Sequence, residues 1–170
     1  MGRWSRFRRL TPHERRLLLS ALVLLPLTRL ALYFVGFRRW QSFLYRLLPR
    51  HHAAVRVGGG AESPPQTLAA AGGDVKSSLQ ARGEMTARMV QAAGREGLGQ
   101  ANCLERSLVL WWLLARQGCA AELRIGTRKK DAELDAHAWV ELNGRALGEE
   151  EDPHARYAAF EQPVTAPPRA

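Results

Sequence analysis

Three kinds of side chain that together perform acyl-transfer chemistry follow one another in the second half of this chain. Cys103 comes first, His137 follows, and a run of acids occupies residues 149–152. In such a set the thiolate attacks a carbonyl carbon and the imidazole moves protons, while a carboxylate holds the ring in one tautomer. We therefore predict that Cys103 is a nucleophile and His137 is its base.

The residues around Cys103 predict the first turn of a helix. Asn102 is a favourable N-cap, and Gly118 is suited to the left-handed residue that ends a helix. Apolar residues recur between them at helical spacing, which predicts one stripe facing a core: Leu104, Leu108, Trp111, Trp112 and Ala115. A thiol in a first turn lies beside amides that lack helical partners, and these amides and the helix dipole lower its pKa. The same amides could hold an oxyanion.

His137 belongs to a predicted strand. Residues 136–142 alternate between two faces, and Asn143-Gly144 is a strong signal for a two-residue hairpin turn. A turn of that length pairs Leu142 with Arg145, which would place Glu150 opposite His137 and Asp152 diagonal to it. A one-residue bulge would instead bring Glu149 or Glu151 onto that face. The spacing alone leaves the third residue open.

The remaining elements predict an α+β domain over residues 79–160. A helix is expected from Leu79 to about Ala93, and a half-buried strand over residues 121–125. The charged residues 128–133 are expected to form a solvated loop. From Pro153 onward the chain is expected to leave the core, with residues 161–170 as a proline-rich tail.

Residues 1–50 form a separate, basic and apolar segment. They contain eleven arginines and one acid, and Thr11 to Glu14 form a capping box at the start of an apolar run over residues 17–37. This run is just long enough to span a bilayer, but Pro26 and Arg29 lie near its middle. Three arrangements stay open: a helical pair packed on the protein, contact with a membrane surface, and a true span. Basic, apolar helices suit a membrane or an acidic protein better than nucleic acid.

A glycine- and proline-rich linker is expected over residues 51–78. The chain has two cysteines, too few for a disulfide framework, and no spacing typical of a metal site. We expect no metal and no cofactor. A reduced, cytosolic location with possible membrane association fits this cysteine usage.

The ordered motifs resemble one family, the lasso-peptide maturation protease, also called the protease half of the lasso B protein. Four segments carry the resemblance: residues 102–108 (Asn-Cys-Leu-Glu-Arg-Ser-Leu), the strand 121–128, residues 136–141 (Ala-His-Ala-Trp-Val-Glu), and residues 156–160 (Arg-Tyr-Ala-Ala-Phe). The set is similar to the C-terminal domain of the microcin-processing protein. It implies a papain-related fold in its transglutaminase-like form, with a nucleophile helix packed on an antiparallel sheet behind apolar N-terminal helices.

The resemblance also implies an activity and partners. It implies a cysteine peptidase that removes the leader from a ribosomally made precursor before a separate cyclase closes the macrolactam. Cys103 takes the position of the nucleophile, His137 that of the base, and Glu149 that of the acid, where the family usually has aspartate. Residues 1–50 lack the strands of the family's leader-binding domain. We therefore expect a separate leader-recognition protein, with the N-terminal helices as a docking surface for it or for a membrane.

Two other functions fit the same residues. An amide transferase of the transglutaminase kind would use an amine in place of water as the acceptor. A non-catalytic transglutaminase-like module would bind peptide without cleaving it, although the presence of both Cys103 and His137 argues against this.

Overall fold

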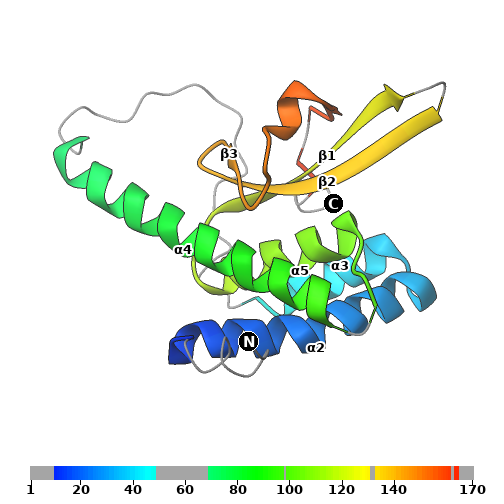
Figure 1. The fold of residues 1–170 in the computed structure, drawn as a ribbon, viewed down its shortest axis with the longest axis horizontal. Helices are drawn as coiled ribbons and strands as arrows, with labels where there is room; N and C mark the ends of the chain where they lie inside the picture. Colours follow the sequence, from blue (N-terminus) through cyan, green and yellow to red (C-terminus); the bar gives the residue numbers. More distant parts are fainter. Residues whose placement is uncertain (1–9, 49–68, 98, 131–132, 162, 165–170) are drawn as a thin grey trace, which may run out of the picture.

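The structure is a computed structural model of the 170-residue chain, and it describes residues 10–48, 69–97, 99–130, 133–161 and 163–164. The described residues form helices below an antiparallel sheet (Figure 1). The elements, in chain order, are α2 (Pro12–Phe34), α3 (Phe37–Arg46), α4 (Ala69–Glu96), α5 (Cys103–Arg116), β1 (Ala121–Lys130), β2 (Glu133–Leu142), β3 (Arg145–Ala146), the short 3-10 helix η3 (Pro153–Ala155) and β4 (Ala158–Ala159). The expected α+β class, with the helix of Cys103 packed on an antiparallel sheet, is confirmed.

Helix α5 lies at the centre of the molecule. Asn102 and Glu105 form a capping box at its start, and Gly118 follows its end with a φ of 79°, as predicted. The predicted single buried stripe was too narrow, because every residue from Leu108 to Leu114 is buried. Helices α2 and α4 and strands β1 and β2 all pack against α5, so its middle turns meet protein on all sides.

The sheet has the order β3-β2-β1-β4. Asn143 and Gly144 both have positive φ, and Leu142 pairs with Arg145, so the predicted hairpin turn is confirmed. The predicted loop over residues 128–133 is wrong, because β1 continues to Lys130 and β2 begins at Glu133. Opposite charges face each other across this extension, where Arg128 pairs with Asp135 and Lys130 with Glu133, and such pairs stabilise a ladder.

Helix α4 begins earlier than expected, at Ala69 rather than Leu79. The glycines at 72 and 73 favoured a linker, but a helix that is anchored by packing further along can continue through residues of low propensity. The rest of the expected linker, residues 51–68, lies outside the described residues.

The N-terminal segment packs on the domain. The predicted capping box at Thr11 is present, and α2 runs without a break through Pro26. It contacts both α4 and α5 through one face, formed by Leu17, Ala21, Leu25, Thr28 and Ala31. Among the described residues α2 is the one helix long and apolar enough to cross a membrane, a property that core helices and signal sequences share.

The chain beyond Pro153 does not leave the core, contrary to the expectation. Pro153 is buried in η3, and β4 pairs with Gly126 and Thr127 of β1. The amide of Val164 donates to the carbonyl of Leu123 at 2.9 Å. The free edge of β1 explains this path, because it offers backbone groups that need partners. Of the expected tail, residues 162 and 165–170 lie outside the described residues.

Candidate active site

Cys103 is the first residue of α5 and is half-buried. The side chain of Asn102 accepts a hydrogen bond from the amide of Glu105 at 2.8 Å, which leaves the amides of Cys103 and Leu104 without helical acceptors. The amide of Leu104 is one of the groups that lower the pKa of the Cys103 thiol. The capping box therefore places the thiol among main-chain donors at the positive end of the helix dipole.

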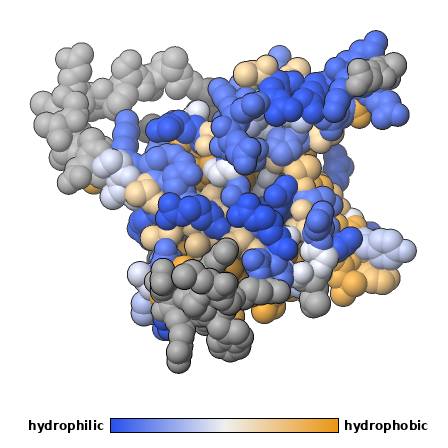
Figure 2. All heavy atoms as spheres, in the orientation of Figure 1, coloured by the Kyte–Doolittle hydropathy of each residue, from blue (hydrophilic) through white to orange (hydrophobic). Residues whose placement is uncertain are grey.

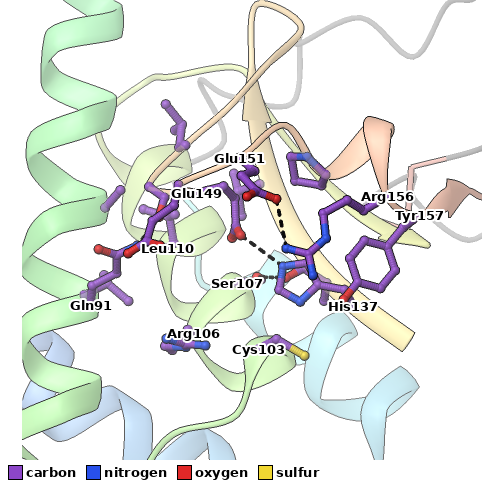
Figure 3. A pocket seen from close by; sticks show the side chains of 18 of the residues that line it. Gln91, Cys103, Arg106, Ser107, Leu110, His137, Glu149, Glu151, Arg156 and Tyr157 are labelled. Carbon is purple, nitrogen blue, oxygen red and sulfur yellow. Dashed lines mark hydrogen bonds and ion pairs between the residues drawn. The ribbon is translucent and has the colours of Figure 1, made fainter. Parts of the chain in front are cut away.

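His137 faces Cys103 from strand β2 (Figure 3). Two aromatic rings lie near its ring and close to parallel with it, with the Trp139 centroid 6.1 Å away and the Tyr157 centroid 5.2 Å away. Trp139 is fully buried, so its ring is held in place beside the imidazole.

Cys103 and His137 lie close enough that each changes the acidity of the other. The interaction with His137 is the main reason that the pKa of Cys103 is lowered, against the effect of burial, and the amides of Ala138 and Leu104 lower it further. The same interaction, followed by the hydrogen bond to Glu149, raises the pKa of His137 from 6.5 to about 9. Both changes favour a thiolate beside an imidazolium.

Glu149 is the acid that contacts the histidine. His137 Nε2–H donates to Glu149 Oε2 at 3.1 Å, which leaves Nδ1 as the nitrogen available to the thiol. The alternative that put Glu150 opposite His137 assumed that the ladder continues, but β3 ends at Ala146. The chain then turns at Gly148, whose φ is 71° and whose carbonyl accepts a hydrogen bond from the Gln91 side chain of α4.

The other acids of the run are engaged elsewhere or line the cleft. Glu151 pairs with Arg156 at 3.1 Å, and Asp152 caps η3 by accepting from the amide of His154. Glu150 lines the cleft. The structure thus brings together Cys103, His137 and Glu149, which are the three positions implied by the resemblance.

A buried hydrogen bond joins the helix of the thiol to the strand of the histidine. Ser107 Oγ–H donates to the carbonyl of Ala138 at 2.8 Å. Ser107 lies one turn after Cys103, and Ala138 is the residue after His137. This bond therefore fixes the separation of the two elements where they carry the reacting groups.

Two side-chain networks support the aromatic stack, and sequence reasoning did not find them. Tyr157 O–H donates to Asp135 at 3.2 Å, and Arg128 contacts both the Asp135 carboxylate and the Tyr157 ring face. The hydrogen bond with Arg128 holds the pKa of Asp135 below its usual value.

The second network lies beneath the stack. The buried Glu141 accepts hydrogen bonds from Trp139 Nε1–H at 2.7 Å and His154 Nε2–H at 2.6 Å. The alternation of β2 predicted that Trp139 and Glu141 share the face of His137. Nothing in the spacing indicated that Tyr157 and His154 return to that face from beyond the hairpin.

The site opens into a cleft of about 360 Å³ between α4, α5 and the chain after β3. Its floor is apolar, with Val90, Leu110 and Leu147, while Arg106 lies beside Cys103 at its rim (Figure 3). Such a cleft has the size and the mixed lining expected for an extended peptide or a similar ligand. Within the described ranges, no group of three or more His, Cys, Asp or Glu side chains is arranged to hold a metal ion.

Comparisons with known proteins agree with this geometry. Searches of curated proteins and of solved structures gave no match. A family model described as the transglutaminase-like superfamily matches residues 31–162, which include α3, α4, α5 and the whole described sheet. The match covers most of the chain, and a thiol at a helix start facing a strand histidine is the arrangement that the resemblance implied. The chain therefore belongs to the transglutaminase-like superfamily.

Proposed function

We propose that the protein is a cysteine peptidase that removes the leader peptide from a lasso-peptide precursor. The observation that carries the chemistry is that Cys103, His137 and Glu149 line one cleft, with His137 bonded to Glu149 and close enough to Cys103 to lower the pKa of the thiol. The substrate class rests on the resemblance of four ordered motifs to the maturation protease.

The reaction begins with the thiolate. Cys103 Sγ attacks the carbonyl carbon before the scissile bond, and the oxyanion that forms accepts hydrogen bonds from the amides of Cys103 and Leu104. Imidazolium His137 then gives its proton to the leaving nitrogen as the C–N bond breaks. The core peptide departs with a free amino terminus, and the leader remains bound to Cys103 as a thioester.

Water completes the cycle. Neutral His137 takes a proton from the water that attacks the thioester, the leader leaves as a carboxylic acid, and the thiolate–imidazolium pair is restored. Glu149 keeps Nε2 protonated and the ring oriented in both halves. An amine at the position of the water would give amide transfer instead, which is the competing function.

The partners proposed with this function are the precursor leader, a separate leader-recognition protein and a lasso cyclase. The described part of the N-terminal segment, residues 10–48, consists of helices α2 and α3 without a strand. This supports the proposal that leader recognition resides in another protein, since a winged-helix leader-binding domain needs strands.

The test is cleavage of a synthetic precursor, followed by mass spectrometry, with the chain alone and with the recognition protein added. We expect leader and core peptide as products, a faster reaction with the recognition protein, and no cleavage by the Cys103→Ala and His137→Ala variants. Cys119→Ala and His13→Ala are the matched controls and should cleave normally. A cross-linked product with an added primary amine would show the transferase, and cleavage by Cys103→Ala would overturn the thiol mechanism.

A further inference from the structure

Helix α2 carries a row of large apolar side chains on the face opposite the one that packs on the domain. We call this row the outer stripe, and it consists of Leu19, Val23, Leu27, Leu30 and Phe34. Its members follow one another at three- and four-residue intervals, so they lie on one side of the helix over about 22 Å. They are between 46% and 72% exposed, and 28% of the most apolar stretch of α2 is buried.

The inner face of α2 is fixed to the domain, which excludes a membrane-spanning arrangement in this fold. Ala21 and Thr28 are almost completely buried. Arg29, whose position argued against a span, points toward the site helix, with its Nε 3.8 Å from the Glu105 carboxylate. A span would expose this face and the arginine to lipid, whereas a helix lying flat keeps both in place.

Helices α2 and α3 carry mostly positive charges. Arg16 lies on α2 one turn before Leu19, and Arg38, Arg39 and Arg46 are exposed on α3. The one acid in residues 10–48 is Glu14, whose carboxylate accepts hydrogen bonds from Thr11 in the capping box. An apolar helix face flanked by arginines is the pattern of a helix that lies in the interface of an anionic bilayer.

The outer stripe also lies away from the cleft. The cleft is lined by α4, α5, β2 and the chain after β3, and by no residue of α2. In Figure 1, α2 forms the lower edge of the molecule, with α4 and α5 between it and the sheet. Figure 2 shows hydrophobic surface at the lower right, over the end of α2 and the turn into α3. A bilayer on this side would leave the cleft accessible to a peptide.

From these observations we infer that α2 docks the protein on an anionic lipid surface through the outer stripe, with the arginines of α2 and α3 contacting lipid headgroups. A continuous aliphatic row without hydrogen-bonding groups suits acyl chains, which require no matching shape. The charges add the preference for anionic lipid. Docking of this kind does not depend on the peptidase chemistry, so it can be tested without a substrate.

The test is flotation of the full chain with vesicles of phosphatidylcholine alone or of phosphatidylcholine mixed with the anionic lipid phosphatidylglycerol. We expect the wild-type chain to float with the anionic vesicles and to float less in high salt. The triple variant Leu19→Gln, Val23→Gln and Leu27→Gln should show at least a fivefold smaller floated fraction. The matched control replaces three exposed apolar residues elsewhere, Val75, Leu134 and Phe160, by glutamine and should float like the wild type.

Three results would overturn the inference. The first is no flotation with either vesicle, and the second is equal flotation of the triple variant and the wild type. The third is a wild-type dimer in light scattering that the triple variant does not form, which would assign the outer stripe to a second copy of the chain. Thermal unfolding and alkylation of Cys103 would check that the triple variant is folded. If it is folded and still binds anionic vesicles as tightly as the control variant, the outer stripe is not the docking surface.

Discussion

Replacing Glu149 by glutamine removes one charge from the site while keeping a side chain of nearly the same size. The amide oxygen of glutamine can still accept the hydrogen bond from His137 Nε2–H, so the ring keeps its orientation. The rise in the pKa of His137 from 6.5 to about 9 corresponds to a preference for imidazolium of about 3 kcal/mol. The interaction with Cys103 is the larger cause and the bond to Glu149 the second.

A hydrogen bond between charged groups contributes about 1.5–3 kcal/mol, and the partial exposure of both side chains favours the lower end of this range. We therefore expect Glu149→Gln to lower the pKa of His137 by about one pH unit. Cleavage should fall by roughly tenfold or more. The variants Glu150→Gln and Asp152→Asn remove the same charge from positions that do not contact His137, and they should change the cleavage rate by less than about threefold.

The assay is the rate at which iodoacetamide alkylates Cys103 as a function of pH, in a Cys119→Ala background. The thiolate–imidazolium pair exists between the pKa of Cys103 and that of His137. Loss of the carboxylate lowers the pKa of His137, so the high-pH limit of the pair moves down from about 9. A weaker imidazolium also stabilises the thiolate less, so the low-pH limit moves up and alkylation at that limit slows.

Glu149 would not be the orienting acid if Glu149→Gln left both limits unchanged while Glu150→Gln or Asp152→Asn moved them. That result would return the orienting role to one of the acids that the hairpin spacing favoured. Cleavage of the precursor by the same three variants gives a second, independent ranking.

Two further substitutions test how His137 is held. Tyr157→Leu removes the ring that stacks on His137, so we expect about a tenfold lower kcat with little change in KM, and a high-pH limit that differs from that of the wild type. Tyr157→Phe keeps the ring and loses only the hydrogen bond to Asp135, so its kcat should stay within about threefold of the wild-type value. Ser107→Ala removes the donor to the Ala138 carbonyl, which should lower the free energy of unfolding in urea by about 1–3 kcal/mol and also slow cleavage. Lower stability with unchanged cleavage would make that bond merely structural.

The sequence was sufficient to predict the elements that carry the thiol and the histidine. Asn102 and Gly118 act through local chemistry, a side-chain cap and a positive φ, and these effects are readable from one residue and its neighbours. The Asn143-Gly144 turn is equally local, so the pairing of Leu142 with Arg145 followed from it.

The features that the residue spacing left open or did not indicate depend on contacts between distant parts of the chain, although the resemblance did imply Glu149. Which acid contacts His137 depends on where β3 ends and on the hydrogen bond from the Gln91 side chain to the carbonyl of Gly148. The spacing of the hairpin residues indicates neither of these. Tyr157 reaches His137 because η3 and β4 return the chain to the free edge of β1. The burial of α5 on all sides likewise required α2, whose apolar sequence is compatible with lipid as well as with a core.

The way the sheet ends has a consequence for how the protein behaves at high concentration. Long, flat edge strands invite pairing between molecules and so promote aggregation. Here the strand at one edge, β3, has two residues, and the other edge is covered by β4 and by hydrogen bonds from Phe160 and Val164 to β1. The segment after Pro153 thus covers the middle of β1, from Leu123 to Thr127, so a version of the chain shortened before this segment would expose that part of the strand edge and would also lose Tyr157.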